Sequence, residues 1–326
     1  MNNCIGCGSI KQTTDVNKEG YTKSNDNELC ERCFRIKHYN AYQKIEKNND
    51  DFKPIIDEIN NSDDLAVVLI DLMNIPFKIK DFINGFKKPV LLVLTKRDLL
   101  PSSLYEERIK EKFVSSNILD IIMVSSLKNY NMDLLMDKIS EYKTTNNAYI
   151  VGYTNAGKSS LVNKILYNYT NQASVITTSI LPSTTIEKIN IEINDELTLI
   201  DTPGLIEEGN IIDFVEHDVL KKIVPKKEIK PITYQIGTRQ FVLIEDLLCV
   251  EFNKENDITI YASNELDIRR SFKEENTNNF ECHMLELKGK EDIVILGLCF
   301  IKIMKKDSVK VYTIPGVNVY KRDSLI

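Results

Sequence analysis

The chain has 326 residues, of which 42% are hydrophobic and 28% charged, and its net charge is −6 at pH 7. This composition predicts a soluble globular protein of two or three domains and excludes one coated throughout with basic residues. No run approaches the roughly 18 apolar residues that a membrane-spanning helix needs. Because Cys4 leaves no room for a leader before it, we expect a cytoplasmic protein.

The first predicted module, residues 1–47, is polar and contains two CxxC pairs. Their cysteines are Cys4, Cys7, Cys30 and Cys33. Two such pairs at this separation predict a Zn²⁺ ion held by four thiolates, with iron as a less favoured alternative. Four protein ligands leave no open position, so we expect a structural ion. The pattern leaves open whether the module also docks on RNA or protein. The remaining cysteines, Cys249, Cys282 and Cys299, lie in apolar runs and are predicted to be buried.

The middle block, residues 48–224, alternates short apolar runs with amphipathic stretches. Strands are expected at 65–70, 89–95, 120–125, 148–153, 188–193 and 197–201. Helices are expected at 51–61, 101–116, 131–143, 158–168 and 210–224. This alternation predicts an α/β domain with a mostly parallel sheet covered on both faces. The exception is 188–201, which reads as an antiparallel hairpin turning at Asn194–Asp195.

A phosphate-binding loop of the form GxxxxGKS follows one strand and opens one helix, which is the context that this motif requires. Its backbone N–H groups and the helix N-terminus would bind phosphate oxygens. The residues expected to hold the nucleotide here are Gly152, Tyr153, Thr154, Asn155, Ala156, Gly157, Lys158, Ser159 and Ser160. Lys158 would meet the β- and γ-phosphates, and the Ser159 hydroxyl would bind Mg²⁺.

A base-reading motif, Thr95-Lys96-Arg97-Asp98, follows an earlier strand. The Asp98 carboxylate would accept from guanine N1–H and the 2-amino group, while the stem of Lys96 packs along the base. Thr95 stands where asparagine is usual, so we expect the loss of an amide that braces this loop against the phosphate loop. Ser125 and Ser126 end the next strand and are candidates for the contact with guanine O6.

Two switch motifs come after the phosphate loop. Asp201-Thr-Pro-Gly204 ends a strand, where Asp201 would reach the magnesium shell and the Gly204 N–H would sense the γ-phosphate. Between Ser159 and this motif lies Pro182-Ser-Thr-Thr185, a predicted first switch in which Thr185 is favoured over Thr184 to close on Mg²⁺.

Hydrolysis would depend on Lys158, Asn155, Thr185 and Gly204. Leu205 occupies the place where many signalling GTPases carry a water-orienting glutamine, which leucine cannot replace. Asn155 would help to hold K⁺ beside the β- and γ-phosphates, and the alternative is a simple turn asparagine.

The order of these motifs, base reader before phosphate loop before second switch, predicts a circularly permuted GTPase domain. In this order the chain after Gly204 leads directly into residues 225–326, a predicted β-rich domain for binding RNA or protein. We find no internal repeat in the sequence.

The permuted order, the four cysteines and the tail together resemble the YqeH family of circularly permuted GTPases. In the tail, Asp292–Leu298, Ile314–Val317 and Lys321–Ile326 are similar to that family's closing motifs. The resemblance implies a GTPase that acts in assembly of the small (30S) ribosomal subunit, contacting rRNA or ribosomal protein. We also expect the protein to be a monomer. It also implies K⁺ stimulation and a hydrophobic residue at the place of Leu205.

Two other interpretations of the sequence remain open. One is a GTP-gated scaffold with negligible hydrolysis, which Leu205 and Thr95 favour. The other is an RNA-binding zinc protein with a vestigial nucleotide site, which the intact Lys158, Ser159 and Asp201 disfavour.

Overall fold

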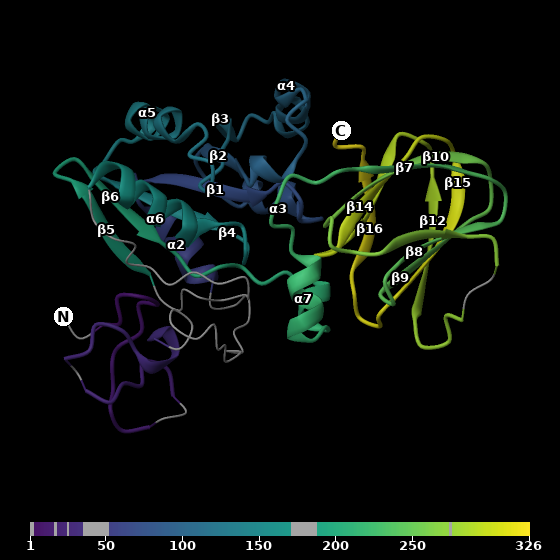
Figure 1. Ribbon diagram of the computed structural model, residues 1–326. Coiled ribbons are helices and arrows are strands. Elements are labelled where there is room, and N and C mark those ends of the chain that lie inside the picture. The colour runs from purple at the N-terminus through teal and green to yellow at the C-terminus, as the bar shows by residue number, and fades with distance from the viewer. Residues whose placement is uncertain (1–2, 16–17, 25, 35–51, 171–187, 274–275) are drawn as a thin grey trace. The chain divides into compact units, whose positions relative to one another are not determined.

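The computed structural model describes residues 3–15, 18–24, 26–34, 52–170, 188–273 and 276–326 (Figure 1). Its contacts divide the chain into two compact units. The first unit comprises Met1–Leu72, Lys78–Arg97 and Phe113–Glu207, and the second comprises Met73–Phe77, Asp98–Lys112 and Glu208–Ile326. Three pieces of the predicted middle block therefore belong to the second unit: Met73–Phe77, Asp98–Lys112 and the stretch 208–224. The division at residues 47 and 224 stays a prediction.

A six-stranded sheet forms the centre of the first unit. Its strands are β1 (Leu65–Asp71), β2 (Val90–Thr95), β3 (Ile118–Met123), β4 (Asn147–Gly152), β5 (Ile189–Asn194) and β6 (Leu197–Asp201). They lie in the order β3-β2-β1-β4-β6-β5, and every pair is parallel except β5–β6. The predicted parallel sheet and its antiparallel hairpin are therefore confirmed. Every residue of β1 and β2 is buried, as expected for strands covered on both faces.

Helices alternate with these strands along the chain. The helices of the middle block are α2 (Lys53–Asn61), α3 (Ile79–Asn84), α4 (Glu106–Lys110), α5 (Met132–Tyr142) and α6 (Lys158–Tyr169), with 3-10 turns at Arg97–Leu99 and Glu111–Phe113. Apolar residues of α5 and α6 share one core with alternate residues of β1, β2 and β4. On the opposite face, the Tyr149 hydroxyl donates to Glu58 of α2 at 2.6 Å.

Two helix predictions were too long. The stretch 101–116 contains only α4 and one 3-10 turn, because it begins with a Pro101 turn and ends in Val114-Ser115-Ser116, residue types that are less favourable inside a helix. The Ser115 hydroxyl accepts from the Asn117 N–H and so forms a local turn. The stretch 210–224 is divided into a 3-10 turn, Ile211–Asp213, and α7 (His217–Ile223). The Asn210 side chain accepts from the Ile212 N–H and so caps that turn separately. No local pattern indicated the six-residue α3.

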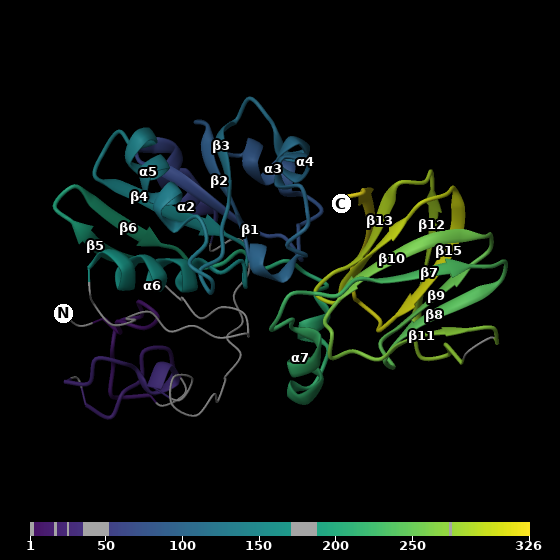
Figure 2. The ribbon, with the colours of Figure 1, turned by 45° about the horizontal axis from the view of Figure 1, so that its top comes forward.

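The second unit is built on two antiparallel five-stranded sheets (Figure 2). Its strands are β7 (Ile232–Ile236), β8 (Gln240–Ile244), β9 (Leu248–Phe252), β10 (Asn256–Ala262), β11 (Ile268–Ser271), β12 (Glu281–Leu287), β13 (Glu291–Ile295), β14 (Cys299–Ile303), β15 (Asp307–Thr313) and β16 (Val319–Asp323). One sheet has the order β16-β13-β14-β10-β7 and the other β11-β8-β9-β15-β12. Inward-facing residues of both sheets form a single apolar core. The predicted β-rich character is confirmed.

The two halves of this β structure repeat each other. The first half comprises β7 to β11 and the second half β12 to β16, so that β7 corresponds to β12, β8 to β13, and so on. When each strand of one sheet is replaced by its counterpart from the other half, the strand order of the other sheet results. The offset between equivalent residues is a constant 51 positions, as from Ile236 to Leu287 or from Leu247 to Leu298. Both members of each of these pairs lie in the core. Our expectation of no internal repeat was wrong because the halves share core positions but few identical residues.

The segment after the second switch packs within the second unit. Asn318 donates from its side chain to the Glu208 carbonyl at 2.8 Å and from its backbone to the Gly209 carbonyl at 2.8 Å. The Ile211 N–H donates to the Leu296 carbonyl at 3.0 Å, and the Ile211 side chain is fully buried. A side chain on Gly297 would collide with Asn210, at 1.9 Å from its Oδ1. The Asp292–Leu298 motif thus contains a glycine that this packing requires.

No helix among the described residues is long and apolar enough to cross a membrane.

Candidate nucleotide-binding site and metal centre

The phosphate loop joins β4 to α6 with a tight backbone. Gly152 has φ +154°, and a Cβ there would lie 2.4 Å from the Leu69 carbonyl oxygen of the neighbouring strand. Gly157 has φ +89° and immediately precedes α6. Asn155 adopts φ +61°, a left-handed conformation that asparagine tolerates better than most residues. This curl places the loop at the N-terminus of a twelve-residue helix, where anions bind.

Lys158 is buried and lies along the inside of this loop. Its Nζ donates to the Gly152 and Tyr153 carbonyls, each at 3.0 Å. Burial lowers the pKa of Lys158 to about 8, although the negative charge of Asp201 acts in the opposite direction. Burial destabilises the charged ammonium group, and a bound phosphate would stabilise it by supplying the opposite charge.

Ser159 and Asp201 meet at the carboxyl edge of the sheet. The Ser159 hydroxyl donates to Asp201 Oδ2 at 3.0 Å, and both side chains are buried. A hydroxyl and a carboxylate are the hard oxygen ligands that Mg²⁺ prefers, so these residues fit the predicted ion. Thr184 and Thr185, the candidates of the first switch, lie outside the described residues.

The second switch runs directly beside the phosphate loop. The Leu205 N–H donates to the Gly152 carbonyl at 3.1 Å, and the Thr154 N–H donates to the Leu205 carbonyl at 2.7 Å. Gly204 has no room for a side chain, since a Cβ would lie 2.9 Å from both Lys158 Nζ and Thr154 Cα. The backbone after Asp201 is therefore in direct contact with the phosphate loop.

Thr95 connects the base-reading loop to the phosphate loop. Its hydroxyl donates to the Ala156 carbonyl at 2.7 Å, with the Ile70 carbonyl as a second acceptor at 3.1 Å. The expectation that replacing asparagine removes this brace was therefore wrong, because the shorter hydroxyl spans the gap between the two loops. Thr95 is buried, so the hydrogen bond is shielded from water.

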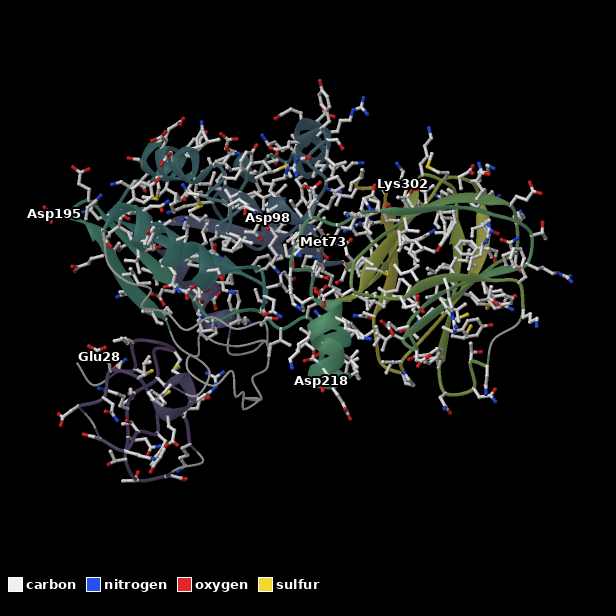
Figure 3. The ribbon with its side chains drawn as sticks, in the orientation of Figure 1. Glu28, Met73, Asp98, Asp195, Asp218 and Lys302 are labelled. Atoms are coloured by element: carbon white, nitrogen blue, oxygen red, sulfur yellow. The ribbon has the colours of Figure 1, made fainter. Side chains whose placement is uncertain are left out.

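Lys96 has a partner that the sequence analysis missed. Its Nζ lies 2.8 Å from Oδ2 of Asp71, which ends β1 opposite Thr95 and is buried. Lys96 itself has φ +59°. The signal for Asp71 was its place at the carboxyl end of a buried strand. Asp98 lies in the 3-10 turn Arg97–Leu99 and is the first residue of a segment assigned to the second unit (Figure 3).

Ser125 and Ser126 come after β3, next to the start of the base-reading motif. The Val124 N–H donates to Leu94, and the Arg97 N–H donates to Val124, which continues the pairing of β2 with β3 past the strand ends. The Ser125 hydroxyl accepts from the Lys128 N–H at 3.0 Å and so stabilises its own turn. Ser126 is half-buried, and its role with the base stays a prediction.

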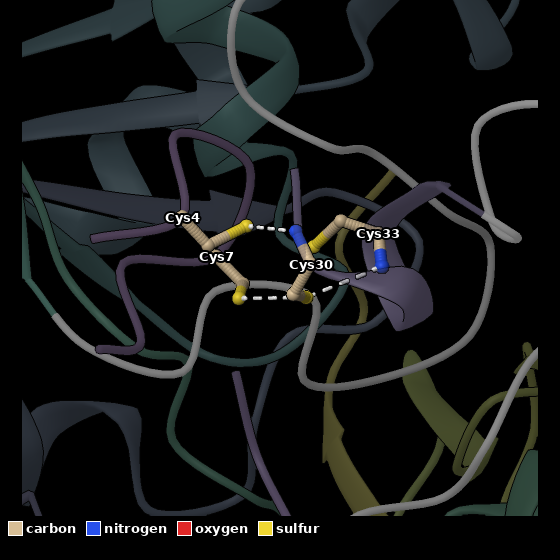
Figure 4. Close-up of side chains that lie close together, drawn as sticks. All are labelled: Cys4, Cys7, Cys30 and Cys33. Atoms are coloured by element: carbon tan, nitrogen blue, oxygen red, sulfur yellow. Dashed lines mark hydrogen bonds between the residues drawn. The ribbon is translucent and has the colours of Figure 1, made fainter. Parts of the chain in front are cut away.

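The four N-terminal cysteines form one cluster (Figure 4). Their sulfur atoms all lie within 4.8 Å of one another, all four side chains are buried, and all four are free thiols. The Sγ atoms of Cys7 and Cys30 are 3.8 Å apart. Four sulfurs at about 2.3 Å from a tetrahedral zinc ion would lie roughly 3.8 Å apart, so this donor set fits Zn²⁺.

Backbone contacts hold these thiols in place. The Cys30 N–H donates to the Cys4 sulfur at 3.2 Å, and the Cys33 N–H donates to the Cys30 sulfur at 3.5 Å. Hydrogen bonds with the neighbouring thiols, Cys30 first, lower the pKa of Cys4, while the hydrogen bond with Cys30 contributes most to raising the pKa of Cys33. Without a cation the four sulfurs cannot all be thiolates at once.

Of the other cysteines, Cys249 and Cys299 are buried as predicted. The prediction was wrong for Cys282, which is exposed. It lies on β12, an edge strand in which Leu285 and Leu287 point into the core. Side chains alternate along a strand, so Cys282 lies on the opposite, outward face.

Comparison with known proteins agrees with this geometry. A family model described as "50S ribosome-binding GTPase" matches residues 147–255, a stretch that contains the phosphate loop and the second switch. The chain is 32% identical to "Uncharacterized protein YqeH" of Bacillus subtilis (strain 168) over an alignment of 364 residues, which covers 99% of both proteins.

Two further relatives match smaller parts of the chain. "NO-associated protein 1, chloroplastic/mitochondrial" of Arabidopsis thaliana is 24% identical over 280 residues, 72% of this chain and 49% of that protein. "GTPase Der" of Clostridium botulinum (strain Hall) is 29% identical over 152 residues, 43% of this chain and 33% of that protein.

The fold, the phosphate loop and the family model together define a P-loop GTPase, whose ligands are GTP or GDP and Mg²⁺. The match over nearly the whole length of both proteins establishes that the chain belongs to the YqeH family of GTPases.

Proposed function

We propose that this GTPase is an assembly factor for the small (30S) ribosomal subunit and that its nucleotide state controls the second unit through the second switch. The observation that carries the proposal is the continuous backbone from the phosphate loop to that unit. The backbone of Leu205 is hydrogen-bonded to the phosphate loop, and only two residues separate Leu205 from Glu208. The Glu208 carbonyl accepts a hydrogen bond from the Asn318 side chain in the second unit. A family model with a ribosomal description supports a ribosomal partner.

In this proposal several groups respond to the γ-phosphate together. Lys158 leaves the carbonyls of Gly152 and Tyr153 to meet the β- and γ-phosphates. Thr185 closes on the nucleotide and the Gly204 N–H binds the γ-phosphate. Mg²⁺ supplies charge neutralisation beside Ser159 and Asp201. Because Leu205 and Gly204 are packed against the loop, their movement carries residues 208–214 and the attached β sheets.

Hydrolysis in this proposal proceeds without a glutamine, since Leu205 has no group that can orient water. Asn155 and a bound K⁺ would supply the missing positive charge near the β- and γ-phosphates. Single-turnover hydrolysis in K⁺ and in Na⁺ tests this step, with Asn155→Ala as the variant. The idea fails if K⁺ and Na⁺ support equal rates in the unaltered protein.

The partner is tested by sedimentation with purified 30S and 50S subunits and their precursors. Each is mixed with the full chain and a non-hydrolysable GTP analogue, GDP or no nucleotide, at several salt concentrations. We expect the GTP analogue to favour the 30S fraction, with a steep salt dependence if phosphate groups are contacted. Lys158→Ala should remove the nucleotide effect and Lys164→Ala, on the same helix, should retain it. Preferential sedimentation with 50S particles would refute the proposed subunit.

A second candidate function is a GTP-gated scaffold that binds without appreciable hydrolysis, and Leu205 is the observation that favours it. The two candidates differ in one measurement. Nucleotide-dependent sedimentation combined with no phosphate release in K⁺, alone or with subunits, would favour the scaffold.

A further inference from the structure

We propose that residues 225–230, which link α7 to β7, position the guanine-reading carboxylate of Asp98, so that the β unit sets the affinity for guanine. This inference depends on the proposed role of Asp98. It concerns a second connection between nucleotide and β unit, separate from the one through the second switch.

The linker is hydrogen-bonded to the turn that carries Asp98. The Ile229 N–H donates to the Leu99 carbonyl at 2.8 Å, and the Ile229 side chain is buried. The Glu228 carboxylate accepts from the Ser102 N–H at 3.1 Å. Leu99 comes directly after Asp98 in the 3-10 turn Arg97–Leu99. The residue next to Asp98 is therefore held by the chain that leads into the β sheets.

The linker is itself held in place by one side chain. Asn264, in the turn between β10 and β11, donates from Nδ2 to the Glu228 carbonyl at 2.8 Å. Its Oδ1 accepts from the Lys230 N–H at 2.8 Å. These two bonds flank Ile229 and fix the direction of its N–H. An asparagine supplies both a donor and an acceptor, as this arrangement requires.

The other side of the base-reading turn is held by the GTPase sheet. The Arg97 N–H donates to the Val124 carbonyl at 3.1 Å, and Thr95 bonds to the phosphate loop. Asp98 therefore follows a residue fixed by the sheet and precedes one fixed by the linker. A carboxylate that must accept two parallel N–H groups of guanine needs both ends of its turn in register. Movement of the linker would remove one end of this support.

Hypoxanthine reports on this geometry because it lacks the 2-amino group of guanine. A carboxylate in register makes two hydrogen bonds to guanine and one to hypoxanthine. One hydrogen bond to a charged group is worth about 1.5–3 kcal/mol, so GDP should bind roughly 10- to 100-fold more tightly than IDP. A displaced carboxylate loses this preference, whereas phosphate contacts are common to both ligands.

The experiment measures the dissociation constants of GDP and IDP for the full chain and its variants. Glu228 and Asn264 are exposed, so Glu228→Ala and Asn264→Ala leave the core intact. We expect their combination to lower GDP affinity about tenfold more than IDP affinity, because GDP depends on two hydrogen bonds to the carboxylate and IDP on one. Glu228→Gln keeps the acceptor and should keep the preference. Asp257→Ala, which breaks an exposed ion pair with Lys305 in the same unit, is the matched control.

Asp98→Asn separates this inference from the function on which it depends. If Asp98→Asn removes the preference while the double variant retains it, Asp98 reads guanine without the linker and the inference is refuted. Equal losses for GDP and IDP in the double variant would also refute it, because they would show general support of the fold. An unchanged preference in Asp98→Asn would refute both the reading of guanine by Asp98 and the inference.

Discussion

Thr95 links the base-reading loop to the phosphate loop through its hydroxyl, although asparagine is the residue usually found at this position. The base-reading motif usually begins with an amide, and the sequence alone indicates the loss of that amide here. The distance from Thr95 Oγ1 to the Ala156 carbonyl is 2.7 Å, which a hydroxyl can bridge because β2 ends so close to the phosphate loop. The two loops are therefore joined by a direct hydrogen bond.

Thr95→Val tests this brace, since valine has nearly the same shape and no donor. Without the hydroxyl, the Ala156 carbonyl loses this hydrogen bond away from water, which costs about 1–3 kcal/mol. We expect GDP affinity to fall about tenfold or more, measured by calorimetry. Thr95→Ser keeps the hydroxyl and should stay within a few-fold of the unaltered protein. Equal binding by the valine variant would show that the brace is dispensable.

Lys158 gives nucleotide affinity a pH dependence of predictable sign. Burial lowers its pKa to about 8, and phosphates bind the protonated form. Below pH 8 the lysine is already charged and affinity should vary little. Above pH 8 the free chain must take up a proton on binding, so affinity should fall by up to about tenfold per pH unit.

The measurement is GTP binding with excess Mg²⁺ between pH 7 and pH 8.5, in two buffers of different ionisation enthalpy. Proton uptake that rises with pH is the expected result. Lys158→Arg carries a charge that does not titrate in this range and should bind with no such uptake. Uptake of the same size in the arginine variant would assign the proton to another group.

At the scale of elements, the sequence was most informative where strands are buried on both faces. β1, β2 and β4 are continuous apolar runs, and their positions were predicted to within two residues. Parallel pairing then brings Thr95, Gly152 and Asp201 to one edge of the sheet, so the motifs predicted most of the candidate site. Asp71 was missed because it belongs to no motif and acts only through its contact with Lys96.

The failures have a common physical cause. The short α3, the divided helix at 210–224 and the repeat in the β sheets all depend on contacts between residues distant in sequence. Gly297, for example, is required by the position of Asn210, and no local pattern reports that contact.

The cysteine module should depend on its metal. Residues 3–34 contain no apolar cluster beyond the four cysteines and Leu29 among those described, so thiolate–metal bonds replace a hydrophobic core. We expect one zinc per chain by elemental analysis. Chelation, or Cys7→Ser, should make amides of this module exchange rapidly while those of β1 to β4 stay protected. Cys282→Ser, at an exposed thiol, is the control and should keep its metal. An unchanged exchange pattern after metal removal would contradict a structural role.

At the scale of the whole chain, the permutation determines which segment the second switch leads into. In the usual motif order a base-reading half comes after that switch, whereas here residues 208–214 pass straight into the β unit. Asn318 holds the start of this passage through two hydrogen bonds. Its side chain is exposed, so its removal leaves the core intact.

Asn318→Ala should therefore weaken the link while leaving the nucleotide site unchanged. We expect normal GDP affinity and hydrolysis, and a smaller difference between the GTP-analogue and GDP states in sedimentation with ribosomal subunits. Asn278→Ala, an exposed asparagine elsewhere in the unit, should keep the full difference. A full difference in the Asn318 variant would show that this contact does not transmit the nucleotide state.

The 51-residue correspondence relates two halves of the β structure that are exchanged between the sheets, since each sheet takes strands from both halves. Equivalent positions of the two halves need not have the same surroundings. In the second half Tyr320 donates its hydroxyl to the Ile75 carbonyl and packs its ring 5.4 Å from that of Phe77, whereas its counterpart in the first half, Arg269, is exposed. The position in β16 thus holds the chain between β1 and α3, while the equivalent position in β11 faces solvent.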